Sequence, residues 1–247
     1  PTPVLAFATN ELKCDVGIMV TASHNPPQDN GYKVYLGGTV DGIHYRGSQI
    51  VSPTDEAIAA KIDSVTSLKS QPRGKVWEVL GEEIIEKYID RTASLATKPG
   101  SLRIVYTAMH GVGTETIQRV FHKAGFQSPI LVDAQSAPDP DFPTVAFPNP
   151  EEPGAIDLAL ETAKSFDAHL VIANDPDADR CAAAINDPAT GWRMLRGDEL
   201  GAIFAESIAR KIDSGIFANS IVSSSIVKKI AAHYNLEFKE TLTGFKW

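Results

Sequence analysis

Short apolar segments alternate with longer amphipathic ones between residues 102 and 173, and this alternation limits the possible folds more than any other feature of the chain. The apolar segments predict strands, and they are residues 102–107, 130–132 and 169–173. The amphipathic segments predict helices, and they are residues 114–124 and 156–166. Strands interleaved with helices are typical of a parallel sheet covered on both faces, so we expect an α/β domain here.

Similar patterns of strands and helices are predicted before and after this segment. Residues 16–20 form an apolar run that predicts a buried strand, and residues 32–36 predict a second one. Gly37-Gly38 and Asp41-Gly42 predict turns. The remaining predicted helices are residues 52–62, 84–95, 198–212 and 226–234, with Asp198 as a helix cap, and the remaining strands are residues 220–224 and 237–239.

The stretch Thr97-Lys98-Pro99-Gly100 ends a predicted helix, because proline lacks the backbone N–H that a helix interior needs. We therefore predict a domain boundary there. The expected domains are residues 1–97, 98–192 and 193–247. The third has the pattern of an unfinished α/β unit, so we expect the chain to be a piece of a longer protein.

Composition excludes some classes of partner. The net charge of −8 argues against non-specific binding to nucleic acid, whose phosphates would repel the chain. No apolar run approaches the roughly 20 residues of a transmembrane helix, so we expect no membrane partner. Cys14 and Cys181 lie far apart in the sequence and have no metal-binding spacing. We therefore expect a reducing, cytoplasmic location.

Three aspartates alternate directly after the predicted strand at residues 169–173: Asp175, Asp177 and Asp179. In an extended loop, alternate side chains point the same way, so the carboxylates converge. Two such charges about 4 Å apart repel by roughly 4 kcal/mol near a protein surface, and a bound cation offsets this repulsion. Oxygen-only ligands favour Mg²⁺ or Ca²⁺, although a solvated acidic turn is the alternative interpretation.

Arg180 follows the aspartates and indicates which chemical group the site binds together with the cation. Arg180 stands where an EF-hand loop needs glycine, which excludes that kind of calcium site. Arginine binds phosphate through two parallel hydrogen bonds, so the loop is typical of a site for phosphoryl groups. The alternative for Arg180 is an ion pair with a neighbouring carboxylate, which contributes little.

The predicted strand at residues 16–20 ends in Thr21-Ala22-Ser23-His24-Asn25-Pro26-Pro27. The prolines cannot continue a strand, so Ser23 and His24 are expected on a loop, where function is commonly found. A phosphorylated Ser23 would carry about −1.5 to −2 charge, and one of its oxygens could complete the shell of a cation on the aspartate loop. The alternative is a turn whose Ser and Asn side chains bind their own backbone.

These motifs carry a resemblance to a known family. Residues 21–26, with Asn30-Gly31-Tyr32-Lys33, resemble the phosphoserine loop of the α-D-phosphohexomutases, which include the phosphoglucomutases and phosphomannomutases. Residues 175–180 resemble their metal loop, although Pro176 stands where the commonest form has glycine. The resemblance implies consecutive mixed α/β sandwich domains. The chain would hold part of the first, the second, and the start of the third of four domains.

The resemblance also implies roles for individual residues. Ser23 would carry the phosphoryl group, and Lys33 would act as a general acid or base on a sugar hydroxyl, which requires a depressed pKa. His24 would support the phosphoserine, and Arg180 would bind the transferring group. The implied ligands of one Mg²⁺ are Ser23, Asp175, Asp177 and Asp179. His110 has the alternatives of an anion-binding turn and, as we favour, a structural role in the second domain.

The end of the chain suggests a branch of the family. Gly244, Phe245 and Lys246 resemble a sugar-binding loop of the phosphoglucomutase-2/phosphopentomutase-like branch. The implied enzyme moves a phosphoryl group between C1 and C6 of glucose or mannose phosphate through a sugar bisphosphate. Glucose 1,6-bisphosphate or a similar compound would be its activator. A phosphopentomutase or a glucose-1,6-bisphosphate synthase is the alternative within the family, and we expect this piece alone to be inactive.

Two other classes remain open from the residues. In a phosphatase of the haloacid-dehalogenase type, Asp175 itself would be phosphorylated, because Asp-x-Asp after an apolar strand suits that chemistry too. A non-catalytic phosphosugar-binding fragment is the other alternative. Acid-stable phosphate on Ser23 would favour the mutase over the phosphatase.

Overall fold

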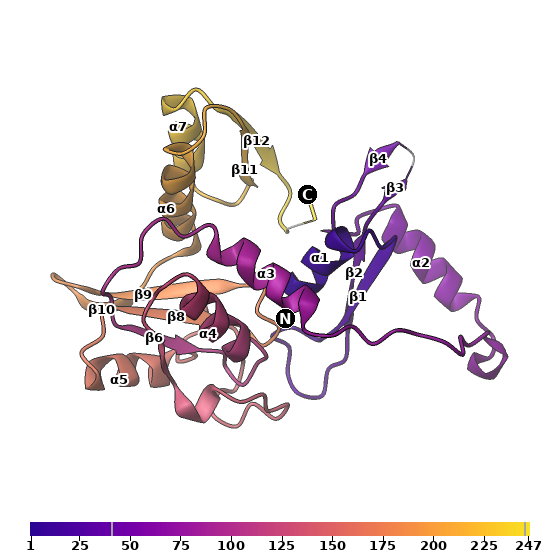
Figure 1. Ribbon diagram of the computed structural model, residues 1–247, viewed down its shortest axis with the longest axis horizontal. Helices are drawn as coiled ribbons and strands as arrows, with labels where there is room; N and C mark the ends of the chain where they lie inside the picture. Colours follow the sequence, from indigo (N-terminus) through magenta and orange to yellow (C-terminus); the bar gives the residue numbers. More distant parts are fainter. Residues whose placement is uncertain (41, 245) are drawn as a thin grey trace.

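A computed structural model describes residues 1–40, 42–244 and 246–247. Its helices and strands fall into three groups (Figure 1). The first group is drawn in indigo and violet, the second holds a five-stranded sheet, and the third, in yellow, ends the chain. The functional loops described below come from the first two groups.

The first group is built on a three-stranded antiparallel sheet. Its strands are β1 (Val16–Val20), β2 (Tyr32–Leu36) and β5 (Ser48–Gln49), in the order β1-β2-β5. The other elements are α1 (Thr2–Glu11), a hairpin of β3 (Thr39–Val40) and β4 (Ile43–His44), and α2 (Thr54–Asp63). Gly42 has the positive φ expected of a turn residue, whereas Asp41 lies outside the described residues. The sequence predicted β1 and β2 with the bounds observed.

The expectation that β1 is buried was wrong. Val16, Ile18 and Val20 are 48%, 55% and 82% exposed. The cause is that α1 covers only one face of the strand, where Gly17 faces Thr9 so closely that a Cβ would lie 2.1 Å from the Thr9 hydroxyl. The three exposed side chains alternate with Gly17 and therefore lie on the opposite face.

The second group holds the sheet β10-β9-β8-β6-β7. α3 (Glu83–Ala93) precedes this group in the chain. The elements of the group are β6 (Ile104–Thr107), α4 (Thr114–Lys123), β7 (Ile130–Leu131), α5 (Asp157–Ser165), β8 (Leu170–Asn174), β9 (Cys181–Asp187) and β10 (Gly191–Met194). β7, β6 and β8 are parallel, as predicted, but β9 and β10 are antiparallel to their neighbours. The expected parallel sheet is thus mixed, because residues 175–180 between β8 and β9 are too few for a crossover.

The packed interior of the second group lies between α5 and the strands β6, β8 and β9. Val105, Ala159, Val171 and Ala184 are each at most 1% exposed in this cluster. Burial of apolar side chains contributes roughly 25 cal/mol per Å², so this layer stabilises the sheet beneath the loop that leaves β8. The aspartate loop therefore begins at the end of a well-packed strand.

The third group contains α6 (Gly197–Ala209), β11 (Ile216–Ser220), α7 (Ile226–His233) and β12 (Glu237–Thr241), with the two strands parallel. The strand predicted at residues 220–224 was misplaced: β11 ends at Ser220, where its pairing with β12 ends. Asp198 is not the cap of α6. The helix begins at Gly197, and the N–H of Arg196 donates instead to the Glu199 carboxylate at 2.9 Å.

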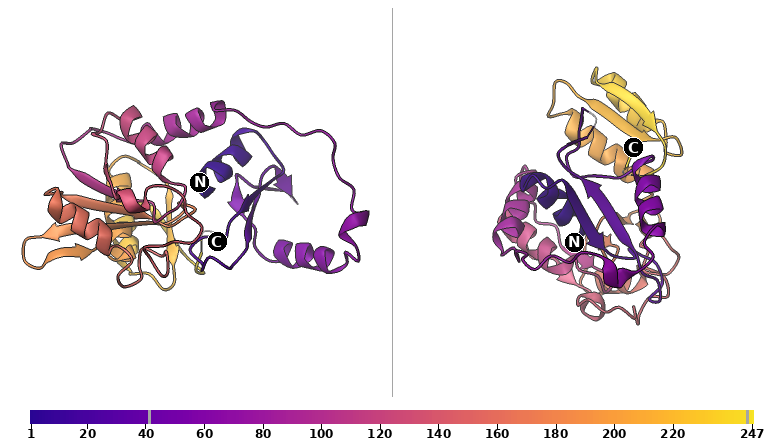
Figure 2. Two further views of the ribbon diagram at one scale, coloured as in Figure 1. Left: turned by 90° about the horizontal axis from the view of Figure 1, so that it is seen from below. Right: turned by 90° about the vertical axis from the view of Figure 1, so that its right-hand side faces the viewer.

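Residues 64–82 connect α2 to α3 around the outside of the molecule, with one short 3-10 helix at Leu68–Ser70 (Figure 2). α3 packs against both α1 and α4 and so joins the first two groups. Among the described residues, no helix combines the length and the apolar character that crossing a bilayer requires.

Candidate active site

Two loops from different groups meet at Ser23. One follows β1, and the other connects β8 to β9. The Ser23 hydroxyl lies 3.1 Å from Oδ2 of Asp175 and 3.0 Å from Oδ1 of Asp177, although 152 and 154 positions separate these residues in the chain. The structure thus brings the serine and the aspartates together, as the sequence predicted.

The backbone of the serine loop turns the Ser23 side chain toward the aspartates. Ser23 has a φ of +57°, in the left-handed region that residues other than glycine rarely adopt. Its N–H donates to the Thr21 hydroxyl at 2.9 Å, and the N–H of Thr21 donates to the Gly31 carbonyl at 3.0 Å. The Ser23 hydroxyl itself contacts carboxylates instead of its own backbone, which is unlike the simple polar turn considered from the sequence.

The aspartate loop is largely buried. Asp175 is fully buried and Asp177 is 3% exposed, while Asp179 is partly exposed. The three residues each offer one carboxylate oxygen, and these oxygens lie within 4.8 Å of one another. Burial makes a solvated acidic turn a poor description. An all-oxygen set of this size fits a hard divalent cation such as Mg²⁺.

Lys33 reaches the same cluster from β2, whose pairing with β1 sets Lys33 opposite Met19. Its Nζ lies 2.7 Å from Oδ2 of Asp177, also bonds to Asp179, and is 3.4 Å from the Ser23 hydroxyl. Burial lowers the pKa of Lys33, but the hydrogen bonds to the two aspartates outweigh this and leave it raised. The depressed pKa expected of a general base is absent, and Lys33 is an ammonium here.

His24 and Arg180 flank the serine. His24 Nδ1 is 3.2 Å from the Ser23 hydroxyl, and the His24 ring packs edge-on against Phe147. Burial, together with the charges of Arg180 and Lys33, lowers the pKa of His24, which favours the neutral ring. The Arg180 guanidinium is only loosely paired, with Nε 3.9 Å from Asp175, and its side chain is 42% exposed.

The carboxylates differ in their protonation. Burial raises the pKa of Asp175 to about 7, and the charge of Asp177 adds to the shift. Burial acts on Asp177 in the same direction, but hydrogen bonds from Lys33 and Thr2 outweigh it and hold the pKa of Asp177 below its usual range. Without a cation, the cluster therefore tends to keep a proton on Asp175 near neutral pH.

Thr2 is a site residue that sequence reasoning missed. Its hydroxyl donates to Oδ2 of Asp177 at 2.5 Å, and its N–H donates to the Asp177 carbonyl at 2.8 Å. Thr2 is the first residue of α1, between two prolines. The Pro-Thr-Pro sequence was the available signal, because proline is favoured at the start of a helix, but it does not identify the partner of the threonine.

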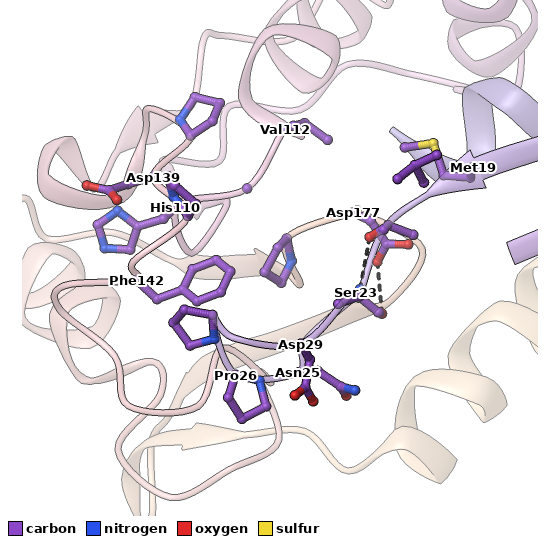
Figure 3. A pocket seen from close by; sticks show the side chains of 18 residues that line it. Met19, Ser23, Asn25, Pro26, Asp29, His110, Val112, Asp139, Phe142 and Asp177 are labelled. Atoms are coloured by element: carbon purple, nitrogen blue, oxygen red, sulfur yellow. Dashed lines mark hydrogen bonds between the residues drawn. The ribbon is translucent and has the colours of Figure 1, made fainter. Parts of the chain in front are cut away.

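A pocket of about 320 Å³ opens beside Ser23 and Asp177 (Figure 3). His110 and Phe142 line the side opposite Ser23. His110 is buried, its Nε2 lies 2.8 Å from the Thr144 hydroxyl, and burial lowers its pKa. These contacts fit the structural role favoured for His110.

The predicted sugar-binding loop lies at the end of the chain. Gly244 has a φ of +118°, and the Lys246 ammonium is 5.9 Å from the centre of the Trp247 ring. Phe245 lies outside the described residues. Among the residues that the structure does describe, no hydrogen bond or ion pair joins Gly244 or Lys246 to the serine or aspartate loop.

The chain is similar in sequence to known proteins over its whole length. Three domain families match the chain: phosphoglucomutase/phosphomannomutase alpha/beta/alpha domain I over residues 1–69, domain II over residues 86–191 and domain III over residues 196–247. A probable phosphomannomutase of Haemophilus influenzae is 48% identical over 252 residues, which cover 100% of this chain and 51% of that protein. A phosphoribomutase of Saccharomyces cerevisiae is 37% identical over 100% of this chain and 44% of its own length.

Solved structures share the fold. A putative phosphomannomutase from Thermus thermophilus superposes with a TM-score of 0.77 at 22% identity, over 100% of this chain and 53% of that one. The chain thus spans about half the length of the curated relatives it matches. With all three domain families found in order, the chain belongs to the phosphoglucomutase/phosphomannomutase family.

Proposed function

We propose that this chain carries the phosphoryl-transfer centre of a phosphosugar mutase that works through a phosphoserine at Ser23. The observation that carries the proposal is the position of the Ser23 hydroxyl, within hydrogen-bonding distance of two aspartates and beside the Lys33 ammonium. In the forward step, the Oγ–P bond of phosphorylated Ser23 breaks and a bond from phosphorus to a sugar hydroxyl oxygen forms. The sugar hydroxyl loses its proton and Oγ of Ser23 gains one, so that the serine ends as a hydroxyl. In the second step, the other phosphate of the sugar bisphosphate returns to Ser23.

The ligands proposed for one Mg²⁺ are Asp175, Asp177, Asp179 and the oxygen on Ser23, since these oxygens cluster in a largely buried site. When bound, the ion supplies positive charge that stabilises the charge developing on the transferring phosphoryl group. Arg180 follows directly in the chain, and its exposed guanidinium suits two parallel hydrogen bonds to phosphate oxygens.

Lys33 and His24 have proposed roles around the serine oxygen. Because hydrogen bonds to Asp177 and Asp179 keep Lys33 protonated, it is not a base in this state, and its ammonium can donate a hydrogen bond or a proton to Oγ as that oxygen leaves phosphorus. The lowered pKa of His24 leaves a neutral ring within 3.2 Å of Oγ. A neutral imidazole can orient the hydroxyl or accept its proton.

The proposed substrate is a hexose phosphate, glucose or mannose, with transfer between C1 and C6 and a sugar bisphosphate as activator. The similarity to a probable phosphomannomutase supports a hexose, whereas the similarity to a phosphoribomutase supports the pentose alternative. Gly244, Phe245 and Lys246 remain the proposed sugar-binding residues. The domain bounds proposed are residues 1–97, 98–192 and 193–247.

The geometry favours Ser23 over Asp175 as the phosphorylated residue. Asp175 is fully buried, one of its oxygens accepts the Arg180 N–H at 2.9 Å, and the other faces Ser23. A phosphatase nucleophile must reach its substrate, and this carboxylate is enclosed. Ser23 is only half-buried and borders the pocket.

The test is intact-mass analysis and peptide mapping of the full-length protein, because the piece alone is expected to be inactive, with the variant Ser23→Ala as control. We expect acid-stable phosphate on Ser23, installed by glucose 1,6-bisphosphate, and a loss of mutase turnover on the order of 10⁴-fold or more in S23A. Phosphate that is labile to acid and base, mapped to Asp175, would instead support the phosphatase. Protein that never carries phosphate on Ser23, even with the bisphosphate, would overturn the proposal.

A further inference from the structure

We infer that Thr2 is a positioning residue for the metal loop: it holds one oxygen of Asp177 so that the other is presented to the cation. The inference rests on the proposed function, because it assumes that Asp177 is a metal ligand. Thr2 contacts neither substrate nor metal in this scheme. It acts only through Asp177.

Thr2 binds Asp177 twice. The hydroxyl donates to Oδ2 at 2.5 Å and the backbone N–H donates to the carbonyl oxygen at 2.8 Å, so both the side chain and the main chain of Asp177 are held. Thr2 is 2% exposed and Asp177 is 3% exposed. Water does not compete well for hydrogen bonds this deeply buried, and a hydrogen bond to a charged group is stronger than one between neutral groups.

The two oxygens of Asp177 have different partners. Oδ2 accepts hydrogen bonds from Thr2 and Lys33, whereas Oδ1 faces the Ser23 hydroxyl at 3.0 Å. A carboxylate anchored through one oxygen cannot rotate without losing those bonds. Oδ1 is thereby fixed in the direction of Ser23, where the proposed cation binds.

Thr2 is better suited than Lys33 to keep this anchor when a cation is present. The Lys33 ammonium carries the same sign of charge as the metal and is on a flexible stem, so the cation repels it. The Thr2 hydroxyl is neutral, and its β-branched side chain is restricted at χ1. Its hydrogen bond to Asp177 can persist in both the metal-free and the metal-bound protein.

The sequence around Thr2 fixes the start of the helix. Pro1 precedes it, and Pro3 has a locked φ and lacks an N–H. The first turn of a helix carries partial positive charge, which favours a nearby carboxylate. Helix α1 therefore connects the metal loop to the first group of elements through Thr2. The prolines on either side of Thr2 restrict its backbone conformation.

Thr9 offers a matched control in the same helix. It is also 2% exposed, but its hydroxyl donates to the Leu5 carbonyl at 2.9 Å and not to a site residue. Replacing either threonine by valine removes a buried hydroxyl at nearly constant volume. Only the change at Thr2 removes a hydrogen bond from Asp177.

The experiment is isothermal titration of the protein with Mg²⁺ alone, in the wild type and in T2V, T2S, T9V and D177N. Loss of a hydrogen-bond partner of a metal ligand typically weakens binding by about 10–100-fold. We expect that loss in T2V, recovery to within about threefold of the wild type in T2S, and wild-type affinity in T9V. Thermal melts in chelator compare the folding of the variants, and T2A against T9A repeats the comparison if T2V does not fold.

The outcomes separate the inference from the proposed function. If D177N abolishes Mg²⁺ binding but T2V and T2A bind like T9V and T9A, the positioning role is wrong and the metal site stands. If D177N binds Mg²⁺ like the wild type, the metal site and the positioning role are both wrong. A loss in T2V that T2S does not recover would also overturn the inference, because the hydroxyl would not be its cause.

Discussion

The aspartate loop and the serine loop are held in different ways. Backbone bonds from two other segments fix the aspartate loop: the N–H of Val112 donates to the Pro176 carbonyl, and the N–H of Thr2 to the Asp177 carbonyl, both at 2.8 Å. The serine loop is held mainly by its own residues, through the bond between Ser23 and Thr21 and a bond from Asn25 to the Ala22 carbonyl. The aspartate loop is thus fixed by hydrogen bonds from other segments, whereas the serine loop is a half-exposed turn that contacts it.

This difference matches the chemistry proposed for the two loops. Metal ligands bind best when they are held in place before the ion arrives, which requires support from the surrounding fold. A serine that gives and receives a phosphoryl group must also meet its substrate. The comparison therefore predicts that changes behind the aspartate loop act through stability and metal affinity, whereas changes at Ser23 act on transfer.

The largest effect on stability should come from adding a side chain at Gly111, which packs directly against Pro176 in the aspartate loop. A Cβ on Gly111 would lie 2.3 Å from the Cα and the carbonyl oxygen of Pro176, which are backbone atoms that cannot move aside by rotation. We expect Gly111→Ala to lower the free energy of unfolding by about 3 kcal/mol, at the upper end of the usual cost of overpacking. Urea unfolding measures it, and Mg²⁺ affinity should fall in parallel.

Gly100→Ala is the matched control, because a Cβ at Gly100 meets nothing within 4 Å. It should leave both the stability and the Mg²⁺ affinity close to those of the wild type. Equal results for the two variants would show that the aspartate loop is not held from behind, and the contrast between the loops would be lost.

The sequence predicted those parts of the fold whose signals are local. β1, β2 and the helices on either side of β7 have clear apolar patterns. β11 could not be placed from propensity, because its bounds follow its pairing with β12, and the β-branched residues just after Ser220 lie in a turn. The strands β3, β4, β5 and β10 were not predicted, because they read Thr-Val, Ile-His, Ser-Gln and Gly-Trp-Arg-Met and none of them belongs to a longer apolar run.

The site shows the same division between local and distant signals. Ser23 and the aspartates were predictable because their chemistry is unusual within a few residues of sequence. Thr2 was not, since its partner is 175 positions away and ordinary helix-start chemistry already explains a threonine beside proline. The raised pKa of Lys33 also depends on carboxylates that only the fold brings near.

A smaller effect is expected in the pH dependence of stability without metal. Burial raises the pKa of Asp175 from 3.8 to about 7, so the folded protein binds a proton there that the unfolded chain releases. The contribution of Asp175 to stability is therefore present below about pH 4 and is lost as pH rises toward 7. Asp175→Asn removes this dependence, together with the part of the lowered pKa of Asp177 that comes from Asp175 and acts in the opposite direction. His24, whose shift also has the opposite consequence, is unchanged between the two proteins.

The measurement is urea unfolding of the wild type and D175N in chelator at several pH values. The stability of the wild type relative to D175N should fall by at least about 1.4 kcal/mol, the free energy of one pKa unit, between pH 4 and 7. If the stability difference between the wild type and D175N does not change with pH, Asp175 is accessible to solvent. The aspartate loop would then be as exposed as the serine loop.

The smallest expected effect tests how Lys33, which comes from the serine-loop side, acts on the aspartate loop. Its ammonium forms ion pairs with the carboxylates of Asp177 and Asp179, which are also proposed ligands of the cation. Lys33→Met removes this competing charge, so Mg²⁺ should bind about threefold to tenfold more tightly, although transfer becomes slower. Lys87→Met is the control, because Lys87 pairs with Glu11 on the exposed surface and should leave the affinity unchanged. Weaker Mg²⁺ binding in K33M than in K87M would mean that Lys33 organises the carboxylates instead of competing for them, and that the aspartate loop depends on the serine-loop side for its order.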